Sequence, residues 1–179
     1  MTYVYSYVSP LGEILIESDG KFLTGLWFGN SPTSGKHPKN TNYTETEIPV
    51  ISETIRWLDI YFSGENPDFT PKFKIMNLTP FRKLVIDEMC RIPYGTTTTY
   101  GEIAKKIAAK SGLAKMSAQA VGGAVGWNPI CIIVPCHRVV GTNGSLTGYG
   151  GGIGNKIALL KTEGIDAGKF TLPKSRKFM

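Results

Sequence analysis

The sequence has 179 residues, of which 41% are hydrophobic and 19% charged, a composition typical of a folded globular protein. Its longest apolar run, from Ile130 to Val134, excludes a membrane span, and the N-terminus has no basic and apolar stretch that would indicate a signal peptide. Three cysteines are too few for a disulfide framework, so we expect a reducing compartment, the cytoplasm.

The net charge of +6 is distributed unevenly along the chain. Residues 1–78 carry 6 Lys or Arg against 9 Asp or Glu, whereas residues 79–179 carry 14 against 5. A basic half joined to an acidic half indicates that one half faces a polyanion such as a nucleic acid. A basic surface that is simply solvated is the alternative that charge alone leaves open.

The first half of the chain has the pattern of a small β-sheet. Aromatic and β-branched residues predict strands at residues 3–8, 13–18 and 22–28, with a hairpin turn at Asp19-Gly20. Residues 29–47 are polar and carry no apolar period, so we expect a long surface loop. Pro49 begins a predicted helix that ends near Phe62, with Ile51, Ile55, Leu58 and Phe62 on one face, and residues 69–76 are candidates for a return to the sheet.

The second half has the pattern of helices. Thr79 followed by Pro80 is a helix start, and helical spacing continues to Met89. Further helices are predicted at residues 100–110, 117–126 and 156–163, and the first two of these suggest a helix-turn-helix. The apolar, β-branched run at residues 130–134 predicts a fully buried strand. The basic tail from residue 169 is expected to be loose.

Cys136 is the candidate nucleophile. Cys90 and Cys131 lie in apolar patterns and are interpreted as small core residues. Cys136 instead follows Pro135 at the end of the buried run and precedes His137, and a basic neighbour favours the reactive thiolate. Because neighbouring side chains of an extended strand point to opposite faces, a turn or a bridging water is needed to connect the two.

Two other kinds of site are disfavoured. Cys131, Cys136 and His137 give a spacing that matches no structural zinc site. The glycine-rich residues 148–154 lack the Gly-Lys-Ser/Thr of a phosphate-binding loop and the strand-borne pattern of a dinucleotide site. We therefore expect neither a metal nor a cofactor.

The predicted helix at residues 117–126 holds two adjacent glycines, Gly122 and Gly123. Each costs about 1 kcal/mol of helix stability relative to alanine, so another factor must offset the cost. Close packing against another helix is one explanation. The other is a smooth helix face that enters the DNA minor groove, which is only ~6 Å wide.

These motifs together resemble one known family. Asn128-Pro129, the run Pro135-Cys136-His137-Arg138-Val139-Val140, then Gly148-Tyr149 and Glu163, are similar to the O6-alkylguanine-DNA alkyltransferases. The resemblance covers residues 79–164 densely and the first half only in outline. It implies an α+β fold, with a small ribonuclease-H-like β-sheet domain at residues 1–78 and a helical, winged-helix-like DNA-binding domain at residues 79–179.

The resemblance also implies a reaction. The Cys136 thiolate would take the alkyl group from O6 of guanine irreversibly, so that each molecule acts once. His137 would deprotonate Cys136 through a water molecule, and Glu163 would orient His137. Asn128 would hold the turn that carries Cys136, and Tyr100 would donate a hydrogen bond to guanine N3.

The resemblance assigns the remaining site residues to the base pocket and to DNA. The carbonyls of Cys136 and Val139 would accept from the guanine amino group, the N–H of Gly150 would face O6, and Tyr149 would line the wall. The residues expected to contact DNA in the minor groove are Ala118, Gln119, Ala120, Gly122, Gly123 and Arg138. Many members of the family have Arg at the position of Gln119. We expect Gln119 still to fill the space left by the flipped base.

The implied partner is double-stranded DNA containing O6-alkylguanine, bound by a monomer. Some relatives bind zinc in the N-terminal domain, but residues 1–78 contain no cysteine and only His37, so we expect no zinc. Three alternative functions differ from this one in mechanism. A lesion-binding module of the same family would lack the acceptor cysteine, which Cys136 argues against. A helix-turn-helix regulator would need base-reading polar side chains at residues 117–126, and a cysteine hydrolase would turn over repeatedly.

Overall fold

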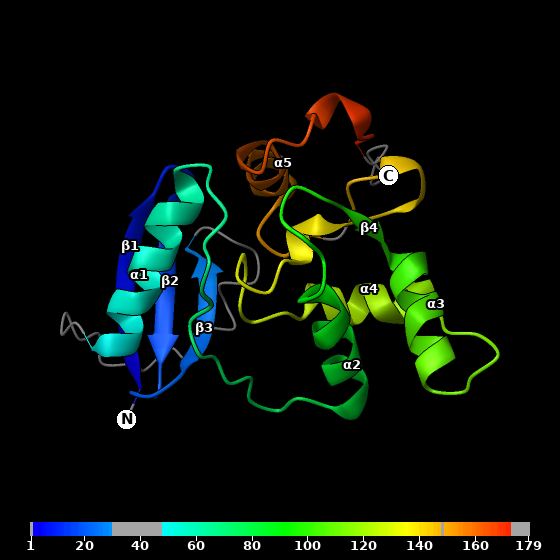
Figure 1. Ribbon diagram of the computed structural model, residues 1–179, viewed down its shortest axis with the longest axis horizontal. Helices are drawn as coiled ribbons and strands as arrows, with labels where there is room; N and C mark the ends of the chain where they lie inside the picture. The colour runs from blue at the N-terminus through cyan, green and yellow to red at the C-terminus, as the bar shows by residue number, and fades with distance from the viewer. Residues whose placement is uncertain (1, 30–47, 148, 173–179) are drawn as a thin grey trace, which may run out of the picture.

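The computed structural model describes residues 2–29, 48–147 and 149–172. It is an α+β protein, with a three-stranded sheet and one helix at one end and a group of helices at the other (Figure 1). The surface loop predicted at residues 29–47, apart from its first residue, lies outside the described residues. Gly148 and the basic tail beyond residue 172 also lie outside them.

The sheet is antiparallel and follows chain order. Its strands are β1 (Tyr3–Ser9), β2 (Gly12–Ser18) and β3 (Leu23–Phe28), in the order β1-β2-β3. In β2 the side chains alternate, and Ile14 and Ile16 are buried. This period of two is expected for a sheet with one face against a core, and the three predicted strands are confirmed.

Helix α1 (Pro49–Phe62) lies against the sheet, and its buried face is broader than the sequence pattern predicts (Figure 1). Ile51 and Leu58 are fully buried as expected, but Ile55 and Phe62 are only half-buried. Tyr61, outside the predicted face, is completely buried. The reason is that α1 packs against the sheet on one side and against the C-terminal half of the chain on another.

Among its described residues, the C-terminal half contains four α-helices and a two-stranded parallel ladder. The helices are α2 (Pro80–Met89), α3 (Tyr100–Lys110), α4 (Ala118–Gly126) and α5 (Ile153–Thr162). The ladder pairs β4 (Thr98–Thr99) with β5 (Val139–Val140). Short 3₁₀ turns are η2 (Cys136–Arg138), η3 (Thr142–Gly144) and η4 (Ala167–Lys169).

Side-chain caps fix where three of these helices begin. Thr79 accepts a hydrogen bond from the Arg82 N–H, and Ser117 caps α4 in the same way. Thr99 and Glu102 form a reciprocal capping box at the start of α3. Such caps satisfy backbone N–H groups that have no partner within the helix, and these three predicted helix starts are confirmed. Helix α5 begins at Ile153, three residues before the start predicted at Lys156, because no side-chain cap marks its beginning.

The two halves share one hydrophobic core. Its buried cluster includes Ile14 and Leu26 from the sheet, Leu58 from α1, Met89 from α2 and Ile107 from α3. Residues 69–76 return to the sheet through a single parallel bridge, Leu23 to Phe73, and form no strand. Within the described ranges, no helix is long and apolar enough to cross a membrane.

Candidate active site and DNA-facing helix

The buried run from Ile130 to Val134 is a turn, so the predicted strand is wrong. Its backbone curls back on itself, because the Val134 N–H donates to the Ile130 carbonyl at 3.0 Å. Ile132 has a φ of +70°, a conformation that β-branched residues rarely adopt. Apolar content and β-branching suit a buried strand and a buried turn equally well, and periodicity does not separate the two.

The side chain of Asn128 holds this turn together. Its amide nitrogen donates to the carbonyls of Ile130 and Val134 at 3.2 and 2.9 Å and contacts Cys136 Sγ at 3.1 Å. Its amide oxygen accepts from the Ile130 N–H at 3.0 Å. One buried side chain thus closes the turn and orients the sulfur, as the sequence analysis expects of it.

The N-terminal sheet anchors the same turn from outside. The Leu26 N–H of β3 donates to the Pro129 carbonyl at 2.8 Å, and the Cys131 N–H donates to the Leu26 carbonyl at 3.0 Å. These bonds form a parallel bridge between Leu26 and Ile130. The sheet therefore helps to position the segment that carries Cys136.

Cys136 lies at the start of η2, immediately after Pro135, and is 5% exposed. Cys136 and His137 are consecutive residues of this 3₁₀ turn, so their side chains do not alternate across an extended strand. A side-chain hydrogen bond from Cys131 lowers the pKa of the Cys136 thiol, burial opposes this, and Asn128 and the charge of Lys156 lower it further. The net direction is down, which favours the nucleophilic thiolate.

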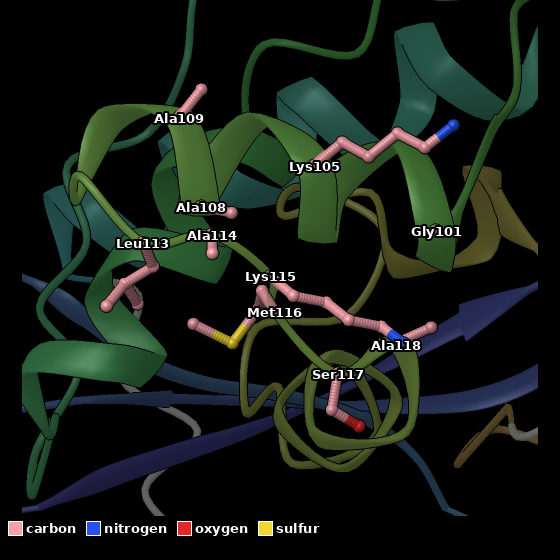
Figure 2. Close-up of a pocket in the computed structure, with 10 residues that line it drawn as sticks. All are labelled: Gly101, Lys105, Ala108, Ala109, Leu113, Ala114, Lys115, Met116, Ser117 and Ala118. Atoms are coloured by element: carbon pink, nitrogen blue, oxygen red, sulfur yellow. The ribbon is translucent and has the colours of Figure 1, made fainter.

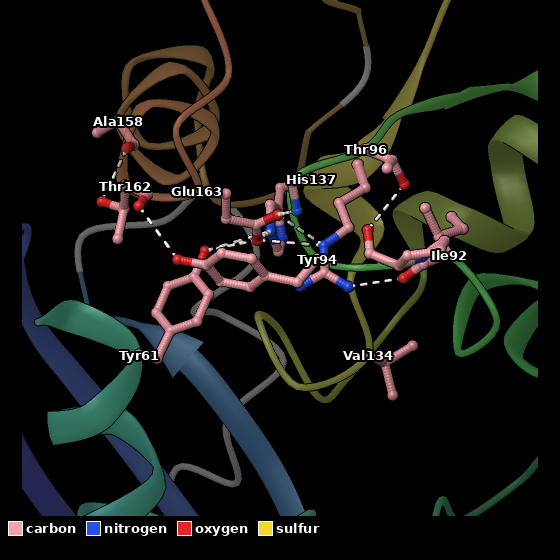
Figure 3. A network of polar contacts seen from close by, with 12 residues as sticks. Tyr61, Ile92, Tyr94, Thr96, Val134, His137, Ala158, Thr162 and Glu163 are labelled. Carbon is pink, nitrogen blue, oxygen red and sulfur yellow. Dashed lines mark hydrogen bonds and ion pairs between the residues drawn. The ribbon is translucent and has the colours of Figure 1, made fainter. Parts of the chain in front are cut away.

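His137 and Glu163 form a fully buried pair (Figure 3). His137 Nε2 lies 2.5 Å from Glu163 Oε1, so we assign the ring proton to Nε2. Nδ1 is then the basic nitrogen, and it is buried with no hydrogen-bond partner among the described residues. Burial lowers the pKa of His137, Glu163 raises it and Arg138 lowers it again, with a net lowering that keeps the ring neutral at neutral pH.

The Glu163 carboxylate, at the C-terminal end of α5, accepts hydrogen bonds from several directions. Tyr61 Oη from α1 donates to Oε1 at 2.9 Å, and the Gly95 N–H donates to Oε2 at 3.0 Å. Burial alone would raise the pKa of Glu163, but the hydrogen bond with His137 and the hydrogen bonds and charge of Arg138 lower it to about 2. Glu163 is therefore ionised, and α5 packs behind η2 as the proposed orienting role requires.

This depressed pKa predicts a specific acid sensitivity. Glu163 has a pKa of about 2 when folded, and a glutamate has one of about 4.3 when unfolded. Its contribution to stability is complete above the unfolded value and is lost as the pH falls from about 4.3 to about 2. Urea unfolding across this range should show a falling free energy of unfolding, and Glu163→Gln should flatten that fall; an identical pH dependence in the variant would contradict the assignment.

Arg138 is not placed where the sequence analysis expects it. Its Nε donates to both oxygens of Glu163, at 3.1 and 2.9 Å, and Nη1 donates to the Ile92 carbonyl at 2.8 Å. Its side chain is only 10% exposed. The expected contact with DNA is therefore corrected, because the η2 turn directs this guanidinium inward, where it neutralises Glu163.

Lys156 of α5 is a buried cation near Cys136. It is completely buried, and Nζ donates to the Val139 carbonyl at 2.6 Å and to the Thr147 carbonyl at 3.4 Å. Burial lowers its pKa to about 8, and the nearby Cys136 opposes this. The ammonium remains charged at neutral pH and stabilises a negative sulfur.

The predicted base-pocket residues surround this cation. The Nζ of Lys156 lies 6.0 Å from the ring centre of Tyr100 and 5.9 Å from that of Tyr149. Tyr100 donates its hydroxyl to the Thr147 carbonyl at 2.9 Å, and burial raises its pKa to about 12. Tyr149 is buried, and its hydroxyl has no hydrogen-bond partner among the described residues. Gly150 follows in a turn.

Helix α4 exposes the residues predicted to face DNA. Ala118, Gln119, Ala120 and Gly123 are exposed and Gly122 is half-buried. A methyl group added at Gly123 would have no neighbour within 4 Å, and one at Gly122 would make ordinary contact with Tyr100. Close helix packing therefore does not explain these glycines, and a smooth exposed face does.

Two neighbouring hollows lie beside the start of this helix. A cavity of about 380 Å³ is lined by Tyr100, Gly101, Ala118, Gln119, Gly122, Gly141, Thr142 and Thr147. A second hollow of about 770 Å³ shares Gly101 and Ala118 with it and continues between α3 and residues 113–117 (Figure 2). The side chains of Lys105 and Lys115 line this second hollow and add positive charge beside α4.

Tyr100 lies between the cavity and Cys136. It lines the cavity together with Gln119, and its hydroxyl interacts electrostatically with Cys136. Cys136 itself is not among the lining residues. Tyr100 and Gln119 thus line the cavity, whereas Asn128, His137 and Glu163 are buried in the protein interior.

Three residues of the site were not found from the sequence. Tyr61 joins Glu163 across 102 positions of the chain, and no local pattern indicates such a contact. Lys156 follows the glycine-rich segment in an amphipathic helix, where a lysine is usually solvated. Cys131 is interpreted from the sequence as a core residue, and it is buried in the hydrophobic core cluster; its effect on the Cys136 pKa has no local sequence signal, because a strand would place the two side chains on opposite faces.

A buried thiol with a base–carboxylate pair, next to the exposed face of α4, fits a cysteine-dependent protein that modifies DNA. Family models agree with this class. The 6-O-methylguanine DNA methyltransferase ribonuclease-like domain matches residues 2–75, and the DNA binding domain of the same family matches residues 80–165. The chain belongs to the O6-methylguanine-DNA methyltransferase family, as the resemblance predicted.

Individual relatives are similar to this chain over nearly their whole length. A methylated-DNA–protein-cysteine methyltransferase of Mycobacterium tuberculosis is 41% identical over 155 residues, covering 87% of this chain and 88% of that protein. One of Methanosarcina acetivorans is 43% identical over 162 residues, covering 90% and 98%. The crystal structure of Mycobacterium tuberculosis OGT in complex with DNA matches with a TM-score of 0.76 and 38% identity, covering 94% of each chain.

Proposed function

We propose that this protein repairs DNA by transferring the alkyl group of O6-alkylguanine to its own Cys136. Transfer to a cysteine is the activity named for the relatives, and this chain is a DNA-binding methyltransferase of that family. The observation that carries the assignment to Cys136 is its position, with Asn128 Nδ2 on its sulfur at 3.1 Å and Lys156 nearby.

The proposed step is a direct displacement. The Cys136 thiolate forms a bond to the alkyl carbon, the bond from that carbon to O6 breaks, and its electron pair stays on guanine, which then takes up a proton. The product is a thioether, which has no easy route back to the thiol. Each molecule therefore acts once.

The buried pair His137–Glu163 prepares the thiol. We propose that His137 Nδ1 takes the Cys136 proton through a bridging water molecule. Glu163 fixes the opposite nitrogen at 2.5 Å, the arrangement of nucleophile, base and orienting group found in many enzymes. Arg138 and Tyr61 hold Glu163, so we assign Arg138 a positioning role in place of a DNA contact.

Substrate contacts follow from the groups around the sulfur. Tyr100 is protonated at neutral pH, so it can exchange the Thr147 carbonyl for guanine N3 and stabilise the leaving base. The Val139 carbonyl already accepts from Lys156, and its second lone pair is available to the guanine amino group. The Gly150 N–H towards O6 and the Tyr149 ring complete the pocket in this proposal.

DNA is proposed to lie along α4 with its minor groove over the small residues. The flipped guanine would enter past Tyr100, and Gln119 would fill the space that it leaves. Support comes from the exposed face at Ala118, Gln119 and Gly123 and from the positive charge of Lys105 and Lys115. We further propose that the protein acts as a monomer in the cytoplasm, where the acceptor thiol stays reduced.

Product counting tests the proposed reaction. The protein is mixed with an excess of a duplex containing one O6-methylguanine, and restored guanine is measured over time. We expect a single burst that ends at one restored base per protein molecule. Continued turnover would favour a cysteine hydrolase, and tight lesion binding without restored guanine would favour the binding module.

Replacing Gly123 by alanine should separate stability from DNA binding. The added methyl has open space around it, so α4 should gain about 1 kcal/mol of stability. The same methyl protrudes from the face proposed to enter the minor groove, so affinity for duplex DNA should fall severalfold. Thermal unfolding and fluorescence anisotropy measure the two effects.

Gly154→Ala is the matched control for this substitution. Gly154 is an exposed glycine of α5, and an added methyl there also has no neighbour within 4 Å. It should leave DNA affinity unchanged. Equal affinities of Gly123→Ala and the parent protein would show that the smooth face of α4 does not meet DNA.

A further inference from the structure

A tyrosine of the N-terminal half reaches the buried pair of His137 and Glu163. Tyr61 lies in the last turn of α1 and is completely buried. Its hydroxyl oxygen lies 2.9 Å from Glu163 Oε1 and 3.3 Å from His137 Nε2 (Figure 3). The reaction proposed above takes place in the C-terminal half, and this hydroxyl is the point at which α1 touches its acid–base groups.

Packing fixes the direction in which the Tyr61 hydroxyl points. The ring is stacked on Trp57 of the same helix, with ring centres 5.3 Å apart and an angle of 8° between the planes. The rings of Tyr94 and His137 meet it nearly at right angles, with ring centres at 6.1 and 6.3 Å. A close-packed interior leaves such a ring one rotamer. The fold of the N-terminal half therefore delivers this hydroxyl to the carboxylate.

The hydroxyl, the carboxylate and the imidazole share their protons in one consistent arrangement. Glu163 is ionised and can only accept, so the single Tyr61 proton points to Oε1. The proton assigned to His137 Nε2 also points to Oε1, and the Tyr61 oxygen offers it a second, more distant acceptor. Burial and the charge of Glu163 raise the pKa of the Tyr61 phenol, so Tyr61 stays a neutral donor.

The charged groups around His137 act in opposite directions on its protonation. Glu163, at the end of α5, favours a second ring proton, whereas Arg138 of η2 and Lys156 of α5 disfavour it. A hydrogen bond donated to a carboxylate stabilises its negative charge. Tyr61 of α1 therefore weakens the pull of Glu163 on a second ring proton, and it adds no charge of its own.

We infer that Tyr61 is a positioning residue for the transfer: its hydroxyl holds Oε1 of Glu163 and takes up part of its charge, so that His137 stays neutral and keeps Nδ1 free as the base. The N-terminal half then contributes to the chemistry as well as to the core. This inference rests on the proposed role of His137 as the base for Cys136.

The test compares Tyr61→Phe with the parent protein, both carrying His37→Gln. The sequence has two histidines, so His137 is then the only imidazole, and nitrogen-15 NMR follows its protonation without DNA. Transfer from an O6-methylguanine duplex is timed over the same pH range. Tyr61→Phe keeps the stacked ring and removes only the hydroxyl. His137 should take up its second proton at higher pH, and transfer should slow about tenfold in the acidic part of the range. At higher pH, where the ring is neutral in both proteins, the rates should converge.

Tyr7→Phe is the matched control. It removes a tyrosine hydroxyl that donates to the exposed Asp59 of the same helix at 2.7 Å, and it should change neither the His137 titration nor the rate. An unchanged titration in Tyr61→Phe, a rate loss that is equal at every pH, or the same shift in Tyr7→Phe would overturn the inference while leaving the proposed function intact. Failure of the parent protein to methylate Cys136 would overturn both.

Discussion

Cys136→Ala should abolish methyl transfer completely while leaving lesion binding intact. The substitution removes the only atom proposed to accept the alkyl group, and no second step can replace it. The exposed face of α4 is unaffected, and Asn128 still donates to the carbonyls of Ile130 and Val134. Single-turnover transfer and anisotropy titration with the same O6-methylguanine duplex measure the two properties.

The matched control for this prediction is Cys90→Ala, which removes an exposed thiol far along the chain from the turn. It should transfer one methyl per molecule at the parental rate. Residual transfer by Cys136→Ala would identify another acceptor. Loss of lesion binding in that variant would mean that the sulfur contributes to recognition as well as to chemistry.

Glu163→Gln should cause the second large effect, on both stability and rate. Glu163 lies between His137 and Arg138, and removing its charge leaves the buried Arg138 guanidinium unpaired. Breaking a buried ion pair from one side typically costs about 3–5 kcal/mol. Transfer should also slow by more than about tenfold, a loss within the range of positioned acid–base catalysis. Urea unfolding and single-turnover kinetics check the two parts.

A double variant separates the two roles of Glu163. Adding Arg138→Met to Glu163→Gln removes the unpaired charge, so part of the lost stability should return. The rate should not recover, because His137 still lacks its carboxylate. If the double variant regained the rate together with the stability, the effect of Glu163 on catalysis would be an effect of folding alone.

Local signals predicted the secondary structure well. Thr79, Thr99 and Ser117 cap helices where the sequence analysis placed helix starts, because a cap depends only on residues within one turn. The strands of the sheet were predictable from alternation and turn residues for the same reason. The run at residues 130–134 failed because its shape depends on Asn128, a side chain outside the run.

The site was predictable in part, through the resemblance of its motif. The turn brings Asn128 to the Cys136 sulfur, and η2 and the end of α5 bring His137 and Glu163 together. Arg138 was misassigned because a basic residue after the motif looks available to DNA until its burial is known. Tyr61 could not be predicted, since it reaches Glu163 from the other half of the chain.

Peptide mass spectrometry after reaction with a duplex containing O6-methylguanine tests the central claim most directly. The account predicts that the peptide carrying Cys136 gains the mass of one methyl group in proportion to the lesion consumed. The peptides carrying Cys90 and Cys131 should remain unmodified. Consumption of the lesion with no gain on the Cys136 peptide, or a methyl group on another residue, would contradict the account.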